Sequence, residues 1–204
     1  MSGTDGDLRL IELTSARVFD DIGGLVGSLD HVFSAPDACL AREETLMSTA
    51  QTMSARLELR QAAWGPETGV LPLSRLISLA RGLPEQISLN ASALDPGTVF
   101  SATRGRIVLN LVLLAADSLP SGGTILLAGQ TGDLFVRLVG AAAAWPPGLA
   151  VCIADEAEAR AALTEGLSLQ TALTALLAHA SGIRLSVVMP PVAQNDPAIL
   201  RLGG

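Results

Sequence analysis

The sequence lacks lysine and tyrosine altogether, and aromatic residues make up only 3% of its 204 positions. All 13 basic residues are therefore arginines, while hydrophobic residues account for 49% of the chain. With so few aromatic side chains, Leu, Val, Ile and Ala must fill the interior. This composition favours helix-rich layers with an aliphatic core, built as one or two modest domains.

Basic residues are also too few to balance the acids, which leaves a formal net charge of −7. Proteins that bind nucleic acid neutralise backbone phosphates with clustered Lys and Arg. We therefore expect no nucleic acid among the direct partners.

Only two cysteines are present, Cys39 and Cys152. Their number and separation exclude a disulfide scaffold and a CxxC metal site, so we expect two thiols in a reducing compartment. The first residues, MSGTDGDLR, lack the basic and apolar regions of a signal peptide. The longest apolar stretch, residues 138–154, is interrupted by Pro146 and Pro147 and is short for a span of about 20 residues. These features predict a soluble, cytoplasmic protein without a membrane partner.

Two long helices are predicted at the N-terminus. From Leu8 the seam positions alternate in steps of three and four, which is the spacing of a heptad seam. Pro36 and Asp37 interrupt this pattern, and a second helix then ends before Gly65. The two seams consist of Leu8, Ile11, Ser15, Val18, Ile22, Leu25, Leu29 and Val32, then Leu46, Ala50, Met53, Leu57, Arg60 and Trp64. An antiparallel hairpin of this length predicts a four-helix bundle formed by homodimerisation.

The periodicity changes after Gly65. Short helices are expected at 72–84 and around 155–163, and longer ones at 97–120 and from Ser168 to a stop at Gly182. Strands are expected at 86–92, on both sides of a tight turn at 130–133, and at 183–190 and 198–202. These elements predict an α+β protein with an apparently antiparallel sheet in an α/β sandwich. We place a helical-hairpin domain at 1–68 and an α/β domain at 69–204.

Two adjacent acids on the first helix, Asp20 and Asp21, are the first candidate for chemistry. With Leu8 at heptad position a, they fall at positions f and g, which point outward. They could act as paired carboxylates in acid and base catalysis, or simply form a solvated helix face. His31 and His179 lie near helix ends, where a histidine usually meets terminal carbonyls or solvent.

Other catalytic motifs find no support in the sequence. Gly23, Gly24 and Gly27 follow no predicted strand and precede no lysine, so they do not form a phosphate loop; close approach of a partner is the better reading. HxxxH, HExxH and GxSxG are absent, which leaves no basis for a common hydrolase and no metal site.

Three stretches resemble the ChpT family of histidine phosphotransferases. They are ARVFDDIGGLVGSL at 16–29, SARLELRQAAWG at 54–65 and RIVLNLVLLAADSLPSGGTILL at 106–127. The resemblance implies a homodimeric phosphorelay protein with sensor-kinase-like dimerisation helices. It also implies a degenerate, Bergerat-like C-terminal α/β sandwich related to histidine-kinase ATPase domains, and response-regulator receiver domains as partners.

A true kinase of this superfamily would carry an asparagine near Leu114 or Ala115 for Mg²⁺ and nucleotide. This sequence has none there, and AAAAWPPGLAV lacks a DxGxG box. The resemblance therefore implies no ATP binding and no cofactor.

The resemblance also places Asp20 where the family has its phosphoacceptor histidine. An imidazole nitrogen can accept a phosphoryl group from an aspartyl phosphate, whereas a carboxylate beside Asp21 adds negative charge where an anion must approach. We therefore expect a degenerate member that docks receivers near Arg17, Asp20, Asp21 and Gly24. Two alternatives stay open: a working relay through His31, and a dimeric scaffold for an unrelated partner.

Overall fold

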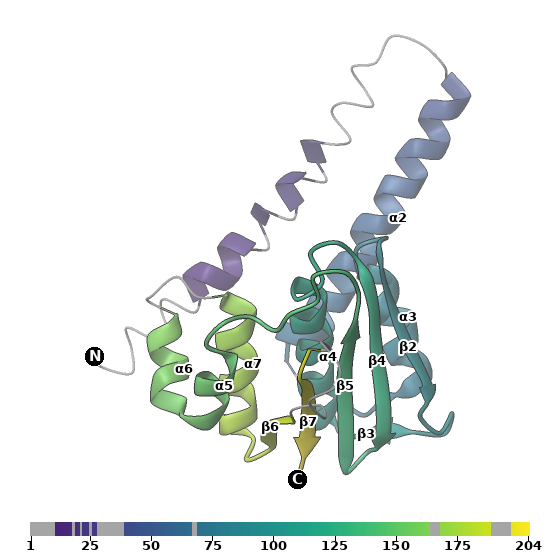
Figure 1. Cartoon of the computed structure of the whole chain (residues 1–204). Coiled ribbons are helices and arrows are strands. Elements are labelled where there is room, and N and C mark those ends of the chain that lie inside the picture. The colour runs from purple at the N-terminus through teal and green to yellow at the C-terminus, as the bar shows by residue number, and fades with distance from the viewer. Residues whose placement is uncertain are drawn as a thin grey trace.

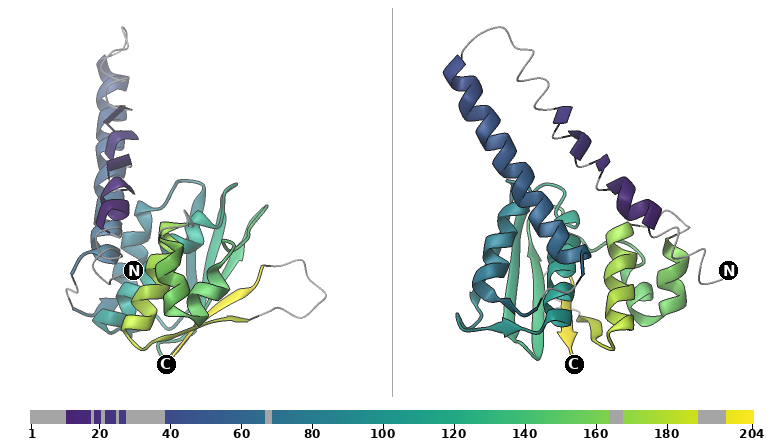
Figure 2. Two further views of the ribbon diagram at one scale, coloured as in Figure 1. Left: turned by 90° about the vertical axis from the view of Figure 1, so that its left-hand side faces the viewer. Right: turned by 180° about the vertical axis from the view of Figure 1, so that it is seen from behind.

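The computed structural model describes residues 11–17, 19–20, 22–24, 26–27, 39–66, 69–163, 168–188 and 197–204, without the side chains of 39–43. Asp21, His31 and the Cys39 side chain lie outside the described residues, so what the sequence predicts for them is untested. The described residues between 11 and 27 are helical, as the heptad pattern predicts. Together with α2, these residues form an arm. The arm projects from a compact body, which consists of the described residues from 69 onward (Figures 1 and 2).

The second helix, α2 (Cys39–Trp64), ends where the sequence predicts, with the Gly65 amide donating to the Gln61 carbonyl at 2.9 Å. Its C-terminal part packs on α4 and on a short 3₁₀ helix, η1 (Ala80–Gly82). Leu59 and Ala63 are buried there, 1% and 0% exposed, and neither belongs to the predicted seam. The helix thus has a second apolar face, turned toward the body, that the heptad pattern did not reveal.

The main sheet has five strands in the order β2-β4-β5-β7-β6. Its strands are β2 (Ile87–Ala93), β4 (Gly123–Gln130), β5 (Asp133–Val139), β6 (Arg184–Val188) and β7 (Ile199–Gly203). The prediction of an antiparallel sheet is wrong for one pair, because β2 runs parallel to β4 and the other three pairs are antiparallel. The intervening helix supplies the long crossover that a parallel pair requires. The sheet is therefore mixed.

In the described part of the chain, six helical segments follow α2, and most of the predicted ones are confirmed. They are α3 (Leu73–Leu79), η1, α4 (Ala102–Asp117), α5 (Leu149–Ala154), α6 (Glu156–Ala162) and α7 (Leu169–Ala180). The predicted helix at 97–120 is shorter, because Ser101 caps its start by accepting a hydrogen bond from the Arg104 amide. Val99 and Phe100 instead form β3, which pairs with β1 (Leu71–Pro72). The helix α5 was not predicted.

One face of the sheet carries the core. Its buried side chains alternate along the strands and include Ile125, Leu127, Leu134, Val136, Leu138, Leu200 and Leu202. Helices cover this face, whereas no helix of the described residues lies on the other (Figure 2). A smaller apolar cluster joins α5, α6 and α7, and Leu13 of the first helix packs against it. The protein is α+β, and both helices of the arm rest on the body.

The arm and body share one core, since Leu59 and Ala63 cluster with the apolar side chains of α4 and the sheet. The domain division at residue 68 stays a prediction. Among the described residues, no helix is both long and apolar enough to cross a membrane.

Candidate functional site

Asp20 lies on the first helix with its side chain exposed, which agrees with its outward heptad position. Gly24, one turn further along, is exposed as well. A Cβ atom added at Gly23, Gly24 or Gly27 would meet nothing within 4 Å. No side chain among the described residues therefore covers this part of the helix surface.

Arg17 lies one turn before Asp20 and connects the first helix to the body. Its Nη2 is 3.3 Å from Oδ1 of Asp117, the last residue of α4. The Arg17 side chain remains 49% exposed and that of Asp117 37% exposed. Arg17 is thus held in an ion pair yet still reaches solvent.

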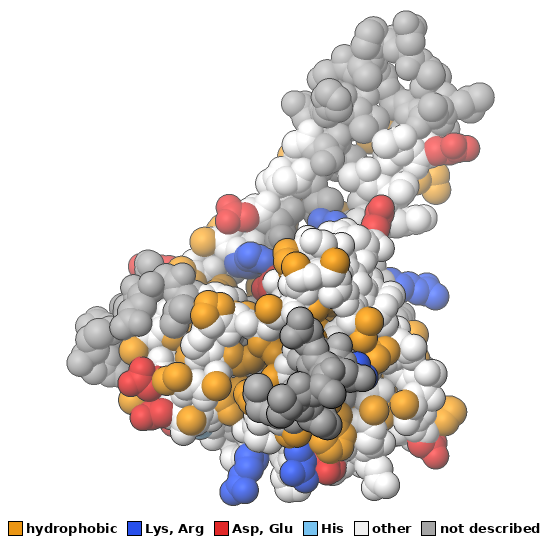
Figure 3. Space-filling view, in the orientation of Figure 1, with side chains coloured by type: hydrophobic (Ala, Val, Ile, Leu, Met, Phe, Trp, Pro, Cys, Tyr) orange, Lys and Arg blue, Asp and Glu red, His pale blue; other side chains and the backbone are white. Residues whose placement is uncertain are grey.

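The first helix, α2, η1, α4 and α7 surround a cavity of about 490 Å³ at the foot of the arm. Its walls include Arg17, Arg56, Leu59, Arg60, Trp64, Leu83, Leu113, Asp117 and residues 168–170. Figure 3 shows basic and acidic side chains close together where the arm meets the body. The cavity adjoins the open surface around Asp20 through Arg17, about 4.5 Å away along the helix axis.

Arg56 and Arg60 line this cavity from α2, because residues four apart lie on one helix face. The Arg60 guanidinium carbon is 5.8 Å from the centre of the Trp64 ring, which is within range of a cation–π contact. Nε of Arg56 and Nε1 of Trp64 are buried and have no hydrogen-bond partner in the described part of the chain. Buried donors of this kind normally have partners.

A buried polar network fixes the helices around the cavity. The Asn110 amide donates to the carbonyls of Ala63 at 2.8 Å and Arg106 at 2.9 Å. Nε2 of Gln170 donates to Oδ1 of Asn110 at 2.9 Å and also contacts Thr174. Since Asn110 is 0% exposed, the network joins α2, α4 and α7 inside the core. It sets the position of the α7 N-terminus.

The position where a kinase would carry its metal-binding asparagine is apolar here. Leu114 and Ala115 are both 0% exposed and belong to the main core. Among the residues that the structure describes, no group of three or more His, Cys, Asp or Glu side chains is placed to hold a metal ion.

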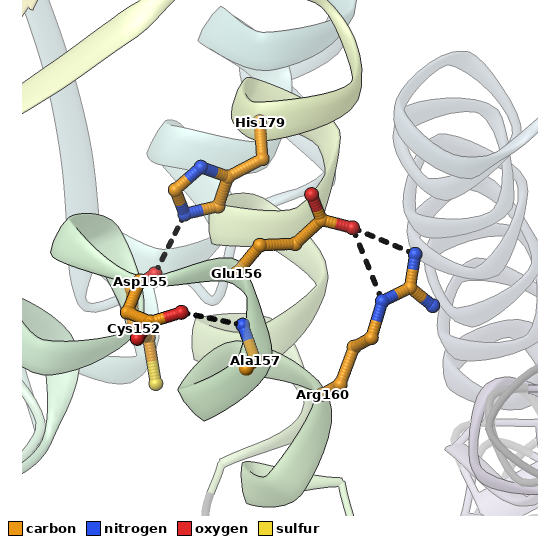
Figure 4. Close-up of polar contacts among 6 residues, drawn as sticks. All are labelled: Cys152, Asp155, Glu156, Ala157, Arg160 and His179. Carbon is orange, nitrogen blue, oxygen red and sulfur yellow. Dashed lines mark hydrogen bonds and ion pairs between the residues drawn. The ribbon is translucent and has the colours of Figure 1, made fainter. Parts of the chain in front are cut away.

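His179 has a structural contact between helices (Figure 4). Its Nε2 lies 2.9 Å from the backbone oxygen of Cys152, which links α7 to α5. Cys152 itself is 2% exposed, and burial, together with the charge of Glu158, raises the pKa of its thiol. A buried thiol with a raised pKa stays protonated and inert. Neither residue adjoins the cavity at the foot of the arm.

The nearby start of α6 is capped in an ordinary way. Oδ1 of Asp155 accepts a hydrogen bond from the Ala157 amide at 2.8 Å, and Glu156 pairs with Arg160 at 2.7 Å (Figure 4). These contacts stabilise a helix end and assemble no reactive group.

A family model for the histidine phosphotransferase C-terminal domain matches residues 76–191, more than half of the chain. The chain belongs to this family. Residues 76–191 thus form the C-terminal domain of a phosphorelay-type histidine phosphotransferase, and the ChpT-like resemblance is confirmed. The match begins within α3, so it does not reach Asp20 or the other site residues of the arm.

Solved structures resemble this histidine phosphotransferase at low identity. A bacterial phosphotransferase structure aligns with 99% of this chain and 97% of its own, with a TM-score of 0.65 and 18% identity. This match shows a shared fold. The cytoplasmic segment of the histidine kinase QseC covers 83% of this chain and 96% of its own, with a TM-score of 0.35 and 13% identity. No curated protein matches the chain.

Sequence reasoning identified Arg17 and Asp20 but missed the charged cavity. The motif at 54–65 contains Arg56 and Arg60, whose spacing of four residues already places them on one helix face. Their convergence with Arg17 and Asp117 depends on how the arm rests on α4, which no local pattern indicates.

Proposed function

We propose that this protein is a degenerate histidine phosphotransferase that binds response-regulator receiver domains without relaying phosphate. It would dock them on the first helix, around Arg17, Asp20, Asp21 and Gly24. The observation that carries the proposal is the exposed carboxylate of Asp20, at the position where the family resemblance requires a histidine.

The chemistry explains why Asp20 cannot simply replace that histidine. Transfer from a receiver's aspartyl phosphate needs a nucleophile in line with the P–O bond that breaks. A neutral imidazole nitrogen supplies a lone pair without bringing a negative charge. A carboxylate at position 20 repels the incoming phosphoryl group, so binding can persist while transfer is lost.

The glycines of the first helix support a docking surface. A glycine inside a helix destabilises it by about 0.5–1 kcal/mol relative to alanine. At Gly23, Gly24 and Gly27 no packing against the described residues requires so small a residue, because an added Cβ meets none of them within 4 Å. Close approach of a partner would explain why all three positions are glycine.

Exposed apolar side chains on the arm support a homodimer. Ile11, Phe19 and Val26 are 61%, 71% and 50% exposed on the first helix, and Met47 is 57% exposed on α2. A groove of about 600 Å³ between the two helices is lined partly by Phe19, Leu57 and Trp64. The arm of a second copy would cover these surfaces in a four-helix bundle.

Two features of the body support the proposal that it is a degenerate ATPase-like domain. Its mixed sheet covered on one face by helices is compatible with a Bergerat-like sandwich, and the buried Leu114 offers no oxygen to a metal–nucleotide complex. In this proposal the body binds no ATP and serves to position the arm.

Calorimetric titration with a panel of receiver domains from the same cell tests this function. At least one receiver should bind saturably, and an Asp20→Arg variant should lose that binding because a long cation disrupts the docking surface. Arg184→Gln changes an exposed charge on the far strand β6 and should leave binding unchanged. Failure of every receiver to bind would overturn the proposal.

A further inference from the structure

The cavity at the foot of the arm concentrates positive charge in an acidic protein. Arg17, Arg56 and Arg60 line it, three of the 13 arginines of a chain whose net charge is −7. Among the described residues that line it, Asp117 is the only acidic one. The cavity therefore attracts anions although the whole molecule repels them.

Two buried donors at the cavity have no acceptor. Nε of Arg56 and Nε1 of Trp64 are both inaccessible to solvent and unpaired within the described residues. A buried donor without an acceptor destabilises the structure, and more so when the group is charged. An acceptor bound in the cavity would satisfy either donor once that side chain turns toward it.

The N-terminus of α7 adds to the same field. Ser168, Leu169 and Gln170 line the cavity, and the side chain of Ser168 does not cap the helix. With 12 residues, α7 is long enough for its dipole to favour an anion at this end. The buried network of Asn110 and Gln170 holds this helix end against α4.

Apolar side chains complete the cavity. Leu59, Leu83 and Leu113 line it beside Trp64, and its volume of about 490 Å³ is far larger than a single phosphate needs. Pockets of this size typically hold small organic molecules. We propose that the cavity binds a small organic phosphate monoester, with its phosphate on Arg17, Arg56 and Arg60 and its organic part against the leucines.

The Asp117 carboxylate competes with the ligand for the Arg17 guanidinium. Its carboxylate lies 3.3 Å from Arg17 Nη2, where an oxygen of the phosphate would bind. The ligand must displace this carboxylate or share the guanidinium with it. Removing the charge of Asp117 should therefore tighten phosphate binding, the opposite of the effect of removing an arginine.

Isothermal titration of the full chain with inorganic phosphate and with phenyl phosphate, at constant ionic strength, tests the site without any receiver domain. Both should bind saturably, phenyl phosphate more tightly because its ring buries apolar surface. Arg56→Gln should weaken both by about tenfold or more, and Asp117→Asn should strengthen both. Arg184→Gln, which removes the same charge from β6, should bind like wild type.

Absence of saturable binding would overturn the proposal, as would an equal loss in Arg56→Gln and Arg184→Gln. Tighter inorganic phosphate than phenyl phosphate would refute the organic monoester and leave a simple anion site. Circular dichroism checks that each variant folds, and if Arg56→Gln does not, unchanged affinity in Asp117→Asn alone refutes the site.

Discussion

At the level of single residues, the pKa of Asp133 is set by an arginine on the neighbouring strand. Arg201 forms a bidentate ion pair with Asp133, with Nε to Oδ1 at 2.6 Å and Nη2 to Oδ2 at 3.0 Å. This hydrogen bonding lowers the pKa of Asp133 below its ordinary value. Since the Asp133 side chain is 42% exposed, solvent screens the pair and its effect on stability is small, but the titration of Asp133 is measurable.

The pH dependence of this pair has a definite sign. Because the folded-state pKa of Asp133 is depressed, its stabilising effect is complete above the unfolded pKa of about 4 and is lost as pH falls through the folded value. In Arg201→Gln, the NMR titration of the Asp133 carboxyl should move toward higher pH. Arg184→Gln serves as the control, and an unchanged Asp133 titration in Arg201→Gln would contradict the assignment.

Asn110 is a second single residue with a large structural effect, because its buried side chain joins three helices. Replacing it with leucine leaves the Ala63 carbonyl and the Gln170 amide without partners in the core. We expect Asn110→Leu to lower the free energy of unfolding by about 1–3 kcal/mol. Urea denaturation measures the change.

The control for this substitution is Gln130→Ala, at an exposed position in β4, which should change stability by less than about 0.5 kcal/mol. A stability of Asn110→Leu equal to wild type would mean that apolar packing fully replaces the network.

Among the helices and strands, the first helix contains glycines that lower its stability but keep its surface accessible. Gly24→Ala removes the helix penalty of glycine, and the added methyl group meets no atom of the described part of the chain within 4 Å. The variant should therefore be more stable by about 0.5–1 kcal/mol, as measured by thermal denaturation. If the surface docks a receiver closely, the same change should weaken receiver binding.

Gly82→Ala should have the opposite effect on stability. Gly82 of η1 lies buried against α2, where an added Cβ would collide with the Ala55 carbonyl. This glycine sets how closely α2 approaches the body, so Gly82→Ala should destabilise the protein by about 1–3 kcal/mol. A variant as stable as wild type would show that α2 can shift without cost.

Element boundaries were predictable wherever local signals were strong. The end of α2 before Gly65 and the turn between β4 and β5 followed from Gly and Pro positions and from period-two alternation. The parallel pairing of β2 with β4 did not, because strand direction depends on how the α4 crossover folds back. β1 and β3, with two residues each, carry too little periodicity to detect.

At the scale of the whole molecule, the arm and the body meet at one place. The first helix, α2, α4 and α7 converge at the foot of the arm, beside the surface that holds Asp20 (Figure 1). The outward position of Asp20 was predictable from the sequence because heptad phase is a local property, whereas its equivalence to the family's acceptor histidine rests on the resemblance. The arginine cavity was not, since it needs the long-range contacts of Leu59, Ala63 and Asn110 to bring four helices together.

The central claim is that the docking surface persists while the reactive residue is lost. The most direct test incubates the full chain with a radiolabelled receiver phosphate and compares wild type with Asp20→His, using Asp20→Ala as the control. Only Asp20→His should take up label, because histidine restores a neutral nucleophile on an intact surface. Labelling of the wild type as strong as that of Asp20→His, or no labelling of Asp20→His by a receiver that binds, would contradict this claim.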